Sequence, residues 1–147
     1  MGKRKALSLI LALCLVFSLC ASAMAAESFT DMTDHWAKSY VDDVVAKGLF
    51  NGISDTAFDP EGSMTRGMFV TVLSRIAGVE VDDSKATAFA DVATNTWYSG
   101  AVAWAVEKGI TNGIDEVTFG VNDPVTREQM ATFIVRYCAA MNITLPE

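Results

Sequence analysis

The chain contains few of the residues on which most catalytic sites, metal sites and disulfide frameworks depend. Among 147 residues it has one histidine, three cysteines and three prolines. Cys14 and Cys20 lie within the first 25 residues, so the rest of the chain keeps only Cys138 and cannot form a disulfide within itself. One histidine, His35, and one cysteine in an apolar helical pattern argue against a zinc site or a nucleophilic triad. We therefore expect no catalytic residue, no metal and no cofactor.

Basic residues are also scarce. The chain has 11 Lys and Arg against 18 Asp and Glu, a net charge of −7. Three of the basic residues are Lys3, Arg4 and Lys5; without them eight remain, and the net charge is −10. This charge argues against nucleic acid and against an anionic membrane surface as general partners. If the ligand is an anion, the few arginines must be concentrated where it binds.

The first 25 residues have the pattern of a secretory signal peptide. The positive start is followed by an apolar run from Leu7 to Leu19 and by small residues that end at Ala25. The apolar run is shorter than the ~20 residues that a membrane span needs. We expect cleavage after Ala25, export from the cell and no membrane association after cleavage.

Beyond this leader the chain repeats itself. A Phe-x-Asp segment begins at Phe29 and again at Phe89. Eight further residues recur 61 positions later as the same amino acid: Trp36, Gly48, Asn51, Gly52, Phe58, Thr65, Arg66 and Arg75 become Trp97, Gly109, Asn112, Gly113, Phe119, Thr126, Arg127 and Arg136. Such a repeat indicates one supersecondary unit used twice. We expect a first repeat over 29–78, a solvated linker over 79–88, a second repeat over 89–138 and a C-terminal tail over 139–147.

Each repeat has the pattern of a helix, a loop and a second helix. The first helix is expected to be capped at Thr33 or Asp34, and in the second copy at Asn95 or Thr96. Lys-Gly pairs mark where these helices end. The loop carries an Asn-Gly pair, which tolerates positive φ. We expect an all-α fold in which the repeats pack into a small helical bundle, with a structural core that includes Trp36, Trp97, Phe58 and Phe119.

The second helices are expected to begin after Thr65 and Thr126. Thr126 and Gln129 form a capping box, whereas Met68 stands where the first copy would need its glutamine. Arg66 and Arg127 follow the caps at once, where a positive side chain opposes the helix dipole. Stability alone would favour an acid there. The pattern fits an anion-binding site, or equally a structural salt bridge to an acid such as Glu128, Asp31 or Asp91.

The ordered set of residues resembles the S-layer homology (SLH) domain. The resemblance rests on Phe-x-Asp, the Trp, Lys-Gly-(Leu/Ile)-x-Asn-Gly, the Phe and Thr-Arg, all of them present twice. The segment from Val125 to Met130 looks like the most characteristic motif of that family. The resemblance extends from Phe29 to about Cys138.

The resemblance implies an all-helical protein at the bacterial cell surface. Domains of this family hold exported proteins to the wall by binding secondary cell wall polymers linked to peptidoglycan, often with pyruvylated sugars. The family's binding arginine matches Arg66 and Arg127, of which Arg127 is favoured because Gly67 replaces the acid that Glu128 keeps. The implied glycan site also includes two glycines that admit the sugar and two acids that accept its hydroxyls: Gly52, Gly113, Asp31 and Asp91.

One alternative from another functional class stays open at this stage. Members of the family commonly carry three repeats with grooves between neighbours, whereas this chain shows two. The repeats could instead pair with other SLH repeats, in further copies of the chain or in a partner, and build a surface array without glycan specificity. Retention by wall preparations, as opposed to association without any wall, would separate the two functions.

Overall fold

A computed structural model describes residues 29–146, and its regular elements within this range are all helices, joined by loops and turns, as the predicted all-α fold requires. A short 3-10 helix, η1 (Thr30–Met32), is followed by four α-helices. These are α2 (Lys38–Ala46), α3 (Arg66–Ile76), α4 (Ser99–Glu107) and α5 (Arg127–Ala140). The leader predicted for residues 1–25 lies outside the described residues. No helix within 29–146 combines the length and the apolar character needed to cross a membrane.

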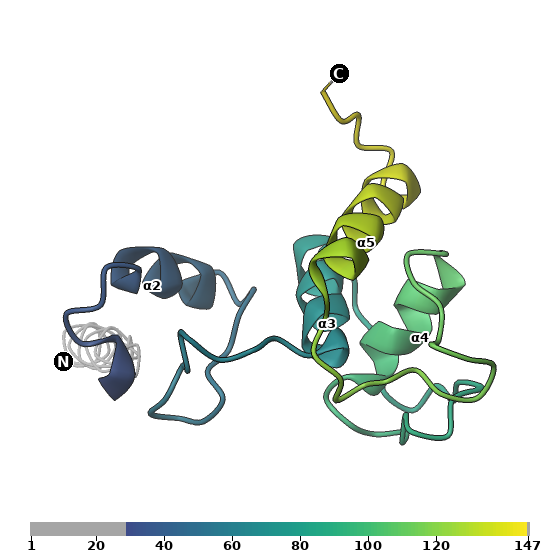
Figure 1. The fold of residues 1–147 in the computed structure, drawn as a ribbon, viewed down its shortest axis with the longest axis horizontal. Helices are drawn as coiled ribbons and strands as arrows, with labels where there is room; N and C mark the ends of the chain where they lie inside the picture. Colours follow the sequence, from purple (N-terminus) through teal and green to yellow (C-terminus); the bar gives the residue numbers. More distant parts are fainter. Residues whose placement is uncertain (1–28, 147) are drawn as a thin grey trace, which may run out of the picture.

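The helices form two lobes that do not coincide with the two repeats. Figure 1 shows α2 apart from α3, α4 and α5, which lie together. The larger core draws side chains from all three of those helices: Val70, Leu73, Val102, Ala105, Phe133 and Tyr137, with Cys138 also buried. The smaller core consists of Phe29, Met32 and Val41. Helix α3 belongs to the first repeat by sequence, but it is buried in the core of the second.

A short backbone pairing fixes the point where α3 enters the second repeat. Val125 N donates to Met64 O at 3.0 Å, and Gly67 N donates to Val121 O at 3.0 Å. A Cβ atom on Gly67 would lie 2.7 Å from Val121 Cγ2. The two segments therefore approach closely because residue 67 has no side chain. The sequence indicates that Gly67 loosens the first helical turn, and the structure gives it this second role.

The predicted ends of the helices are confirmed at most positions. Gly48 and Gly109, which follow α2 and α4, both have φ +68°, the left-handed conformation that terminates a helix. Thr65 Oγ1 accepts a hydrogen bond from Met68 N. Thr126 and Gln129 form the complete capping box. Helix α5 continues to Ala140, so the predicted C-terminal tail begins inside a helix.

The first helix of each repeat begins later than the sequence pattern suggests. Ala37 and Tyr98 occupy the N-cap positions, and neither helix has a side-chain cap. Trp36 and Trp97 therefore lie in a turn ahead of the helix, where their side chains are 81% and 56% exposed. Their predicted place in the core is not what the structure shows, because helical periodicity does not extend back to them. Phe119, by contrast, is fully buried.

The segment predicted to be a solvated linker is attached to α4. Gly100 N donates to Asp83 Oδ1 at 3.0 Å, and Ser99 Oγ donates to Asp83 O at 2.8 Å. Lys85 forms an ion pair with Glu107. Residues 79–88 thus bind both the first turn and the last residue of the helix that follows them.

Candidate functional site

Arg66 lies in the interior of the second repeat. Its side chain is 3% exposed. Nε donates to Phe119 O and Nη2 donates to Asn112 O, each at 2.9 Å. The guanidinium carbon lies 4.7 Å from the centre of the Phe119 ring and 5.3 Å from that of Phe133. Arg66 thus fixes the loop of the second repeat to the start of α3.

These contacts settle which groups Arg66 binds in the protein. Burial lowers the pKa of the Arg66 guanidinium, and the carboxylates of Asp123 and Asp91 oppose that shift. A guanidinium remains charged under such conditions. No ion pair among the described residues involves it, and its hydrogen bonds go to backbone carbonyls. As placed here, Arg66 does not present its guanidinium to a ligand.

Arg127 occupies the same position at the start of α5, but its surroundings are the opposite. Its side chain is exposed. No ion pair formed by the described residues involves it. The prediction that Arg127 binds an anion remains a prediction, and the structure leaves its side chain accessible for that role.

Asp91 binds the backbone of the loop in its own repeat. Its carboxylate accepts hydrogen bonds from Phe119 N and Gly120 N at 2.8 Å and from Val121 N at 3.0 Å. Partial burial raises the pKa of Asp91, but these three donors outweigh burial, so the pKa lies below its ordinary value. The carboxylate that the resemblance assigns to sugar hydroxyls is engaged in holding the loop.

Asp31 performs the same task in the first repeat. It accepts from Asp59 N at 2.7 Å and from Phe58 N at 3.0 Å. The hydrogen bonds from these two backbone groups lower the pKa of Asp31. Contact between Asp31 or Asp91 and a sugar stays a prediction.

The two predicted glycines also serve the packing of their loops. A Cβ atom on Gly52 would lie 2.3 Å from the Phe29 ring, and one on Gly113 would lie 2.4 Å from the Phe89 ring. Neither glycine has positive φ. Close packing against an aromatic ring and against two backbone carbonyl oxygens of the same loop, rather than an unusual backbone conformation, therefore requires glycine at these two positions. Gly52 in addition lines a pocket, described next.

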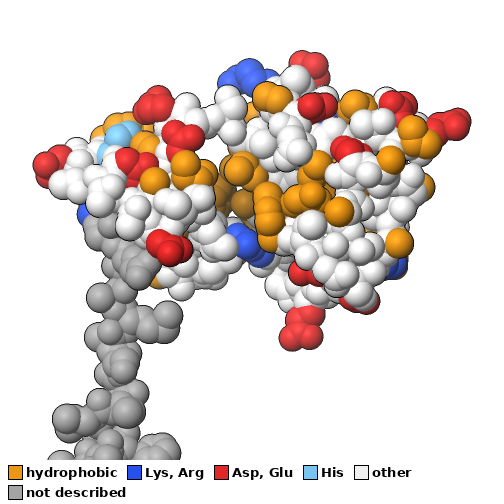
Figure 2. All heavy atoms as spheres, turned by 90° about the horizontal axis from the view of Figure 1, so that it is seen from below, with side chains coloured by type: hydrophobic (Ala, Val, Ile, Leu, Met, Phe, Trp, Pro, Cys, Tyr) orange, Lys and Arg blue, Asp and Glu red, His pale blue; other side chains and the backbone are white. Residues whose placement is uncertain are grey.

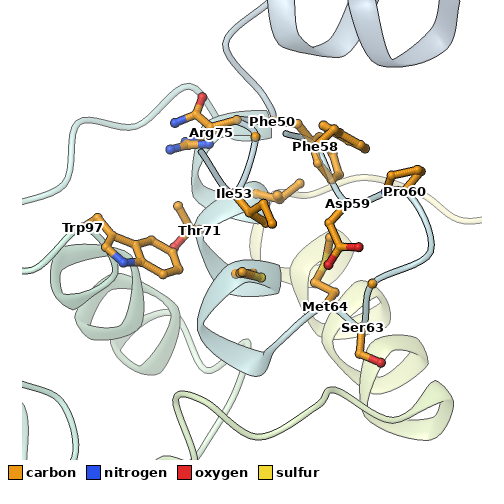
Figure 3. Close-up of a pocket in the computed structure, with 15 residues that line it drawn as sticks. Phe50, Ile53, Phe58, Asp59, Pro60, Ser63, Met64, Thr71, Arg75 and Trp97 are labelled. Atoms are coloured by element: carbon orange, nitrogen blue, oxygen red, sulfur yellow. The ribbon is translucent and has the colours of Figure 1, made fainter. Parts of the chain in front are cut away.

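A pocket of about 600 Å³ lies between the loop of the first repeat, helix α3 and the turn that carries Trp97. Figure 2 shows the hollow between the two lobes, with hydrophobic side chains gathered beside it. The close-up in Figure 3 shows two ends. Trp97, Arg75, Thr71 and Ile53 lie at one, and Phe58, Asp59, Pro60 and Met64 lie at the other. We call these the Trp97 end and the Phe58 end.

The Trp97 end combines a cation with an exposed aromatic face. Arg75 Nη1 donates to Leu49 O at 3.3 Å. With the Asn51 amide turned so that its oxygen faces the guanidinium, Asn51 accepts from Arg75 Nη2 at 3.1 Å. These two bonds use part of the donor capacity of the guanidinium, which has five N–H groups. Trp97, half exposed, lies on the same end.

Sequence reasoning placed Arg75 in the repeated set but did not assign it to the site. A signal was available, because Arg75 recurs as Arg136. Arg136 is exposed, and it does not line the pocket. Trp97, which lines the pocket together with Arg75, comes from the following repeat.

Comparisons of this sequence with a family profile and with curated proteins agree on one family. The sequence profile described as "S-layer homology domain" matches residues 28–67 and 88–131. An endoglucanase of Bacillus sp. (strain KSM-635) is 34% identical over 156 residues, covering 98% of this chain and 16% of the relative. An amylopullulanase of Thermoanaerobacterium thermosulfurigenes is 30% identical, covering 82% of this chain and 6% of the relative. S-layer protein EA1 of Bacillus anthracis is 28% identical, covering 77% and 13%. The chain spans less than a fifth of these three relatives.

Proposed function

The chain belongs to the S-layer homology domain family, and from this premise we propose that it binds a secondary cell wall polymer linked to peptidoglycan, an anionic, pyruvylated glycan. SLH repeats are a cell-surface anchoring module of S-layer and surface-enzyme proteins. In this proposal the exported chain is held to the wall non-covalently, and it binds the glycan without turning it over.

The Trp97 end of the pocket is the observation that supports this function best. The carboxylate of a pyruvyl ketal is a small planar anion, which a guanidinium grips with two parallel N–H groups. Arg75 supplies that cation at the wall of a concave surface. Trp97 supplies a flat apolar face with room for a sugar ring. The pairing of these two side chains fits a charged sugar better than a neutral one.

Net charge makes the position of Arg75 significant. The part of the chain after residue 25 has eight basic residues against 18 acidic ones. An anionic polymer is repelled by such a surface except where cations are concentrated and acids are kept occupied. Asp31 does not line the pocket, and backbone N–H groups of the loop donate to its carboxylate; Asp59 is the acid that lines the pocket, at the Phe58 end and not at the Trp97 end (Figure 3). Arg75 is therefore the main attractive charge that we assign to the pocket.

Co-sedimentation with purified wall sacculi tests the proposal. One set of sacculi keeps the secondary polymer, and the other has it removed by mild acid. We expect the purified chain to pellet with the first set alone. Arg75→Ala and Trp97→Ala are each expected to weaken binding by about tenfold or more, as loss of a central contact typically does.

The repeat supplies matched control variants. Arg136→Ala and Trp36→Ala remove the same residue types at the equivalent positions of the other copy, and neither residue lines the pocket. Both are expected to bind as the unaltered chain does. Arg127→Ala runs alongside, because a loss of binding there would move the anion site to the start of α5. Equal binding to both sets of sacculi by a folded chain would refute glycan recognition.

A further inference from the structure

The loops of the two repeats have the same conformation but different occupants. Asp59 and Gly120, at equivalent positions, have φ +61° and +76°. Ser54 N donates to Ala57 O at 3.2 Å, and in the second repeat Asp115 N donates to Thr118 O at 3.3 Å. The loop of the first repeat is therefore already in the shape that, in the second repeat, holds an arginine.

The Phe58 end of the pocket is the equivalent of the site that Arg66 fills. The Arg66 site consists of Asn112, Phe119 and Phe133. Their counterparts 61 positions earlier are Asn51, Phe58 and Val72, and all three line the pocket. None of the hydrogen bonds found within residues 29–146 reaches the carbonyl oxygen of Asn51 or of Phe58. Phe58 is only half buried, whereas Phe119 is fully buried.

An arginine at the start of a helix capped in the same way is exposed elsewhere on the molecule. Thr126 caps α5 as Thr65 caps α3, and Arg127 follows it as Arg66 follows Thr65. Asp59 at the Phe58 end gives the pocket a negative charge opposite to that of Arg127. The start of α5 therefore matches the Phe58 end in shape and in charge. No residue of α5 lines the pocket, so the two surfaces are not in contact at this site within one chain.

We propose that the Phe58 end binds the start of α5 from a second copy of this chain. Arg127 of one copy enters the pocket of the next and donates to the carbonyls of Phe58 and Asn51, repeating the contacts of Arg66 between molecules. The contact joins different surfaces of the two copies. It is therefore head-to-tail, and it extends to a ring or a filament. It uses the Phe58 end and the backbone carbonyl of Asn51, and it leaves the side chains of Arg75 and Trp97 free.

One difference between the two arginine segments sets the strength of this contact. Gly67 follows Arg66 and permits close approach to Val121, whereas Glu128 follows Arg127. In the proposed contact the start of α5 approaches Pro60, the counterpart of Val121. The side chain of Glu128 occupies space there that Gly67 leaves empty in the contact within the chain. The association is therefore expected to be weaker than the contact within the chain. It is also expected to strengthen in a Glu128→Gly variant.

Sedimentation velocity of the purified chain over a wide concentration range tests the proposal. We expect association that rises with concentration, weakened at least roughly tenfold by Arg127→Ala, as for removal of a buried charge contact. Glu128→Gly is expected to shift the equilibrium the other way. Arg136→Ala makes the same charge change on the same helix and is expected to leave association unaltered. A chain that stays monomeric up to its solubility limit, or an Arg127→Ala variant that associates as well as the parent, overturns the proposal.

A mixing experiment distinguishes this contact from general stickiness. Met64→Trp fills the Phe58 end with bulk, while Met64→Lys places there a positive charge, like that of Arg127, with less bulk (Figure 3). Either variant keeps its Arg127, and Arg127→Ala keeps its pocket. Each is expected to be monomeric alone, and a mixture of the two types is expected to form a one-to-one dimer and nothing larger. Circular dichroism verifies folding, and larger species in the mixture contradict a single head-to-tail contact.

Discussion

The loops of the two repeats have nearly the same internal contacts, yet one encloses an arginine and the other is open. Asp91 holds the second loop and Asp31 the first, through backbone donors at equivalent positions. The two loops differ in whether a helix from another repeat packs beside them. The second loop receives α3 from the preceding repeat, whereas no helix within residues 29–146 takes that place beside the first. Two copies of one motif can therefore have different roles because of what lies next to them.

The same comparison separates Arg66 from Arg127, and the largest expected effect follows from it. Arg66→Ala leaves the carbonyls of Phe119 and Asn112 without their donors and is expected to cost about 3 kcal/mol of unfolding free energy. Arg127→Ala is expected to change it by about 0.5 kcal/mol or less, as at other exposed positions. Urea unfolding at a dilution that keeps the chain monomeric measures both. Equal losses would show that the two arginines have equivalent surroundings after all.

The glycines of the two loops allow each lobe to be destabilised separately. Gly52→Ala and Gly113→Ala each force a methyl group against a phenylalanine ring, which is expected to cost about 2 kcal/mol. In hydrogen exchange, Gly52→Ala should speed exchange in α2, and Gly113→Ala should speed it in α3 and α4. Gly48→Ala is the control for a glycine with positive φ and open surroundings. Faster exchange in the same helices for both variants would mean that the two lobes unfold together.

Acid is expected to weaken both loops through their aspartates. The pKa of Asp91 is lowered in the folded protein, so its charge adds stability above the unfolded value of about 3.9, and this stability is lost as the pH falls through the folded pKa. Asp91→Asn is expected to cost on the order of 1 kcal/mol at pH 7, with the difference shrinking below about pH 4. Unfolding curves from pH 7 to pH 2 measure it. Asp31→Asn should show the same pH trend, and a difference that grows in acid would contradict this account.

The smallest expected effect concerns the incomplete capping box of the first repeat. Met68→Gln places at the third position of α3 the residue type that completes the box in α5. We expect a gain of about 0.5 kcal/mol in unfolding free energy. The reverse change, Gln129→Met, should lower stability by a similar amount. No change in either direction would indicate that the threonine hydroxyl alone satisfies the helix terminus.

Local chemistry was predictable from the sequence, and this covers much of the fold. Thr65, Thr126, Gly48 and Gly109 act within one helical turn, so their roles could be inferred and are confirmed. The start of each first helix was placed too early, because Trp36 and Trp97 are repeated and aromatic but lie in a turn. The repeat shows that both positions keep a tryptophan, but it does not show whether the side chain is buried or exposed.

The candidate site depends on contacts between repeats, which the sequence pattern does not contain. The pattern treats Arg66 and Arg127 alike, whereas burial separates them because α3 crosses into the second repeat. The pattern likewise gave no sign that Arg75 and Trp97 line one pocket, since they come from different copies. The structural role of Gly67 depends on the same crossing.

The crossing of α3 also determines where this protein can be cut or joined. The unit with the larger core runs from the start of α3 to the end of α5, out of phase with the sequence motif that repeats. A chain truncated between the motifs would keep α3 but lose the side chains that bury it. Because a chain is synthesised from its N-terminus, α3 is made before α4 and α5, whose side chains bury it. Gene fusions designed at motif boundaries would therefore divide a folding unit, whereas junctions just ahead of Thr65 would preserve it.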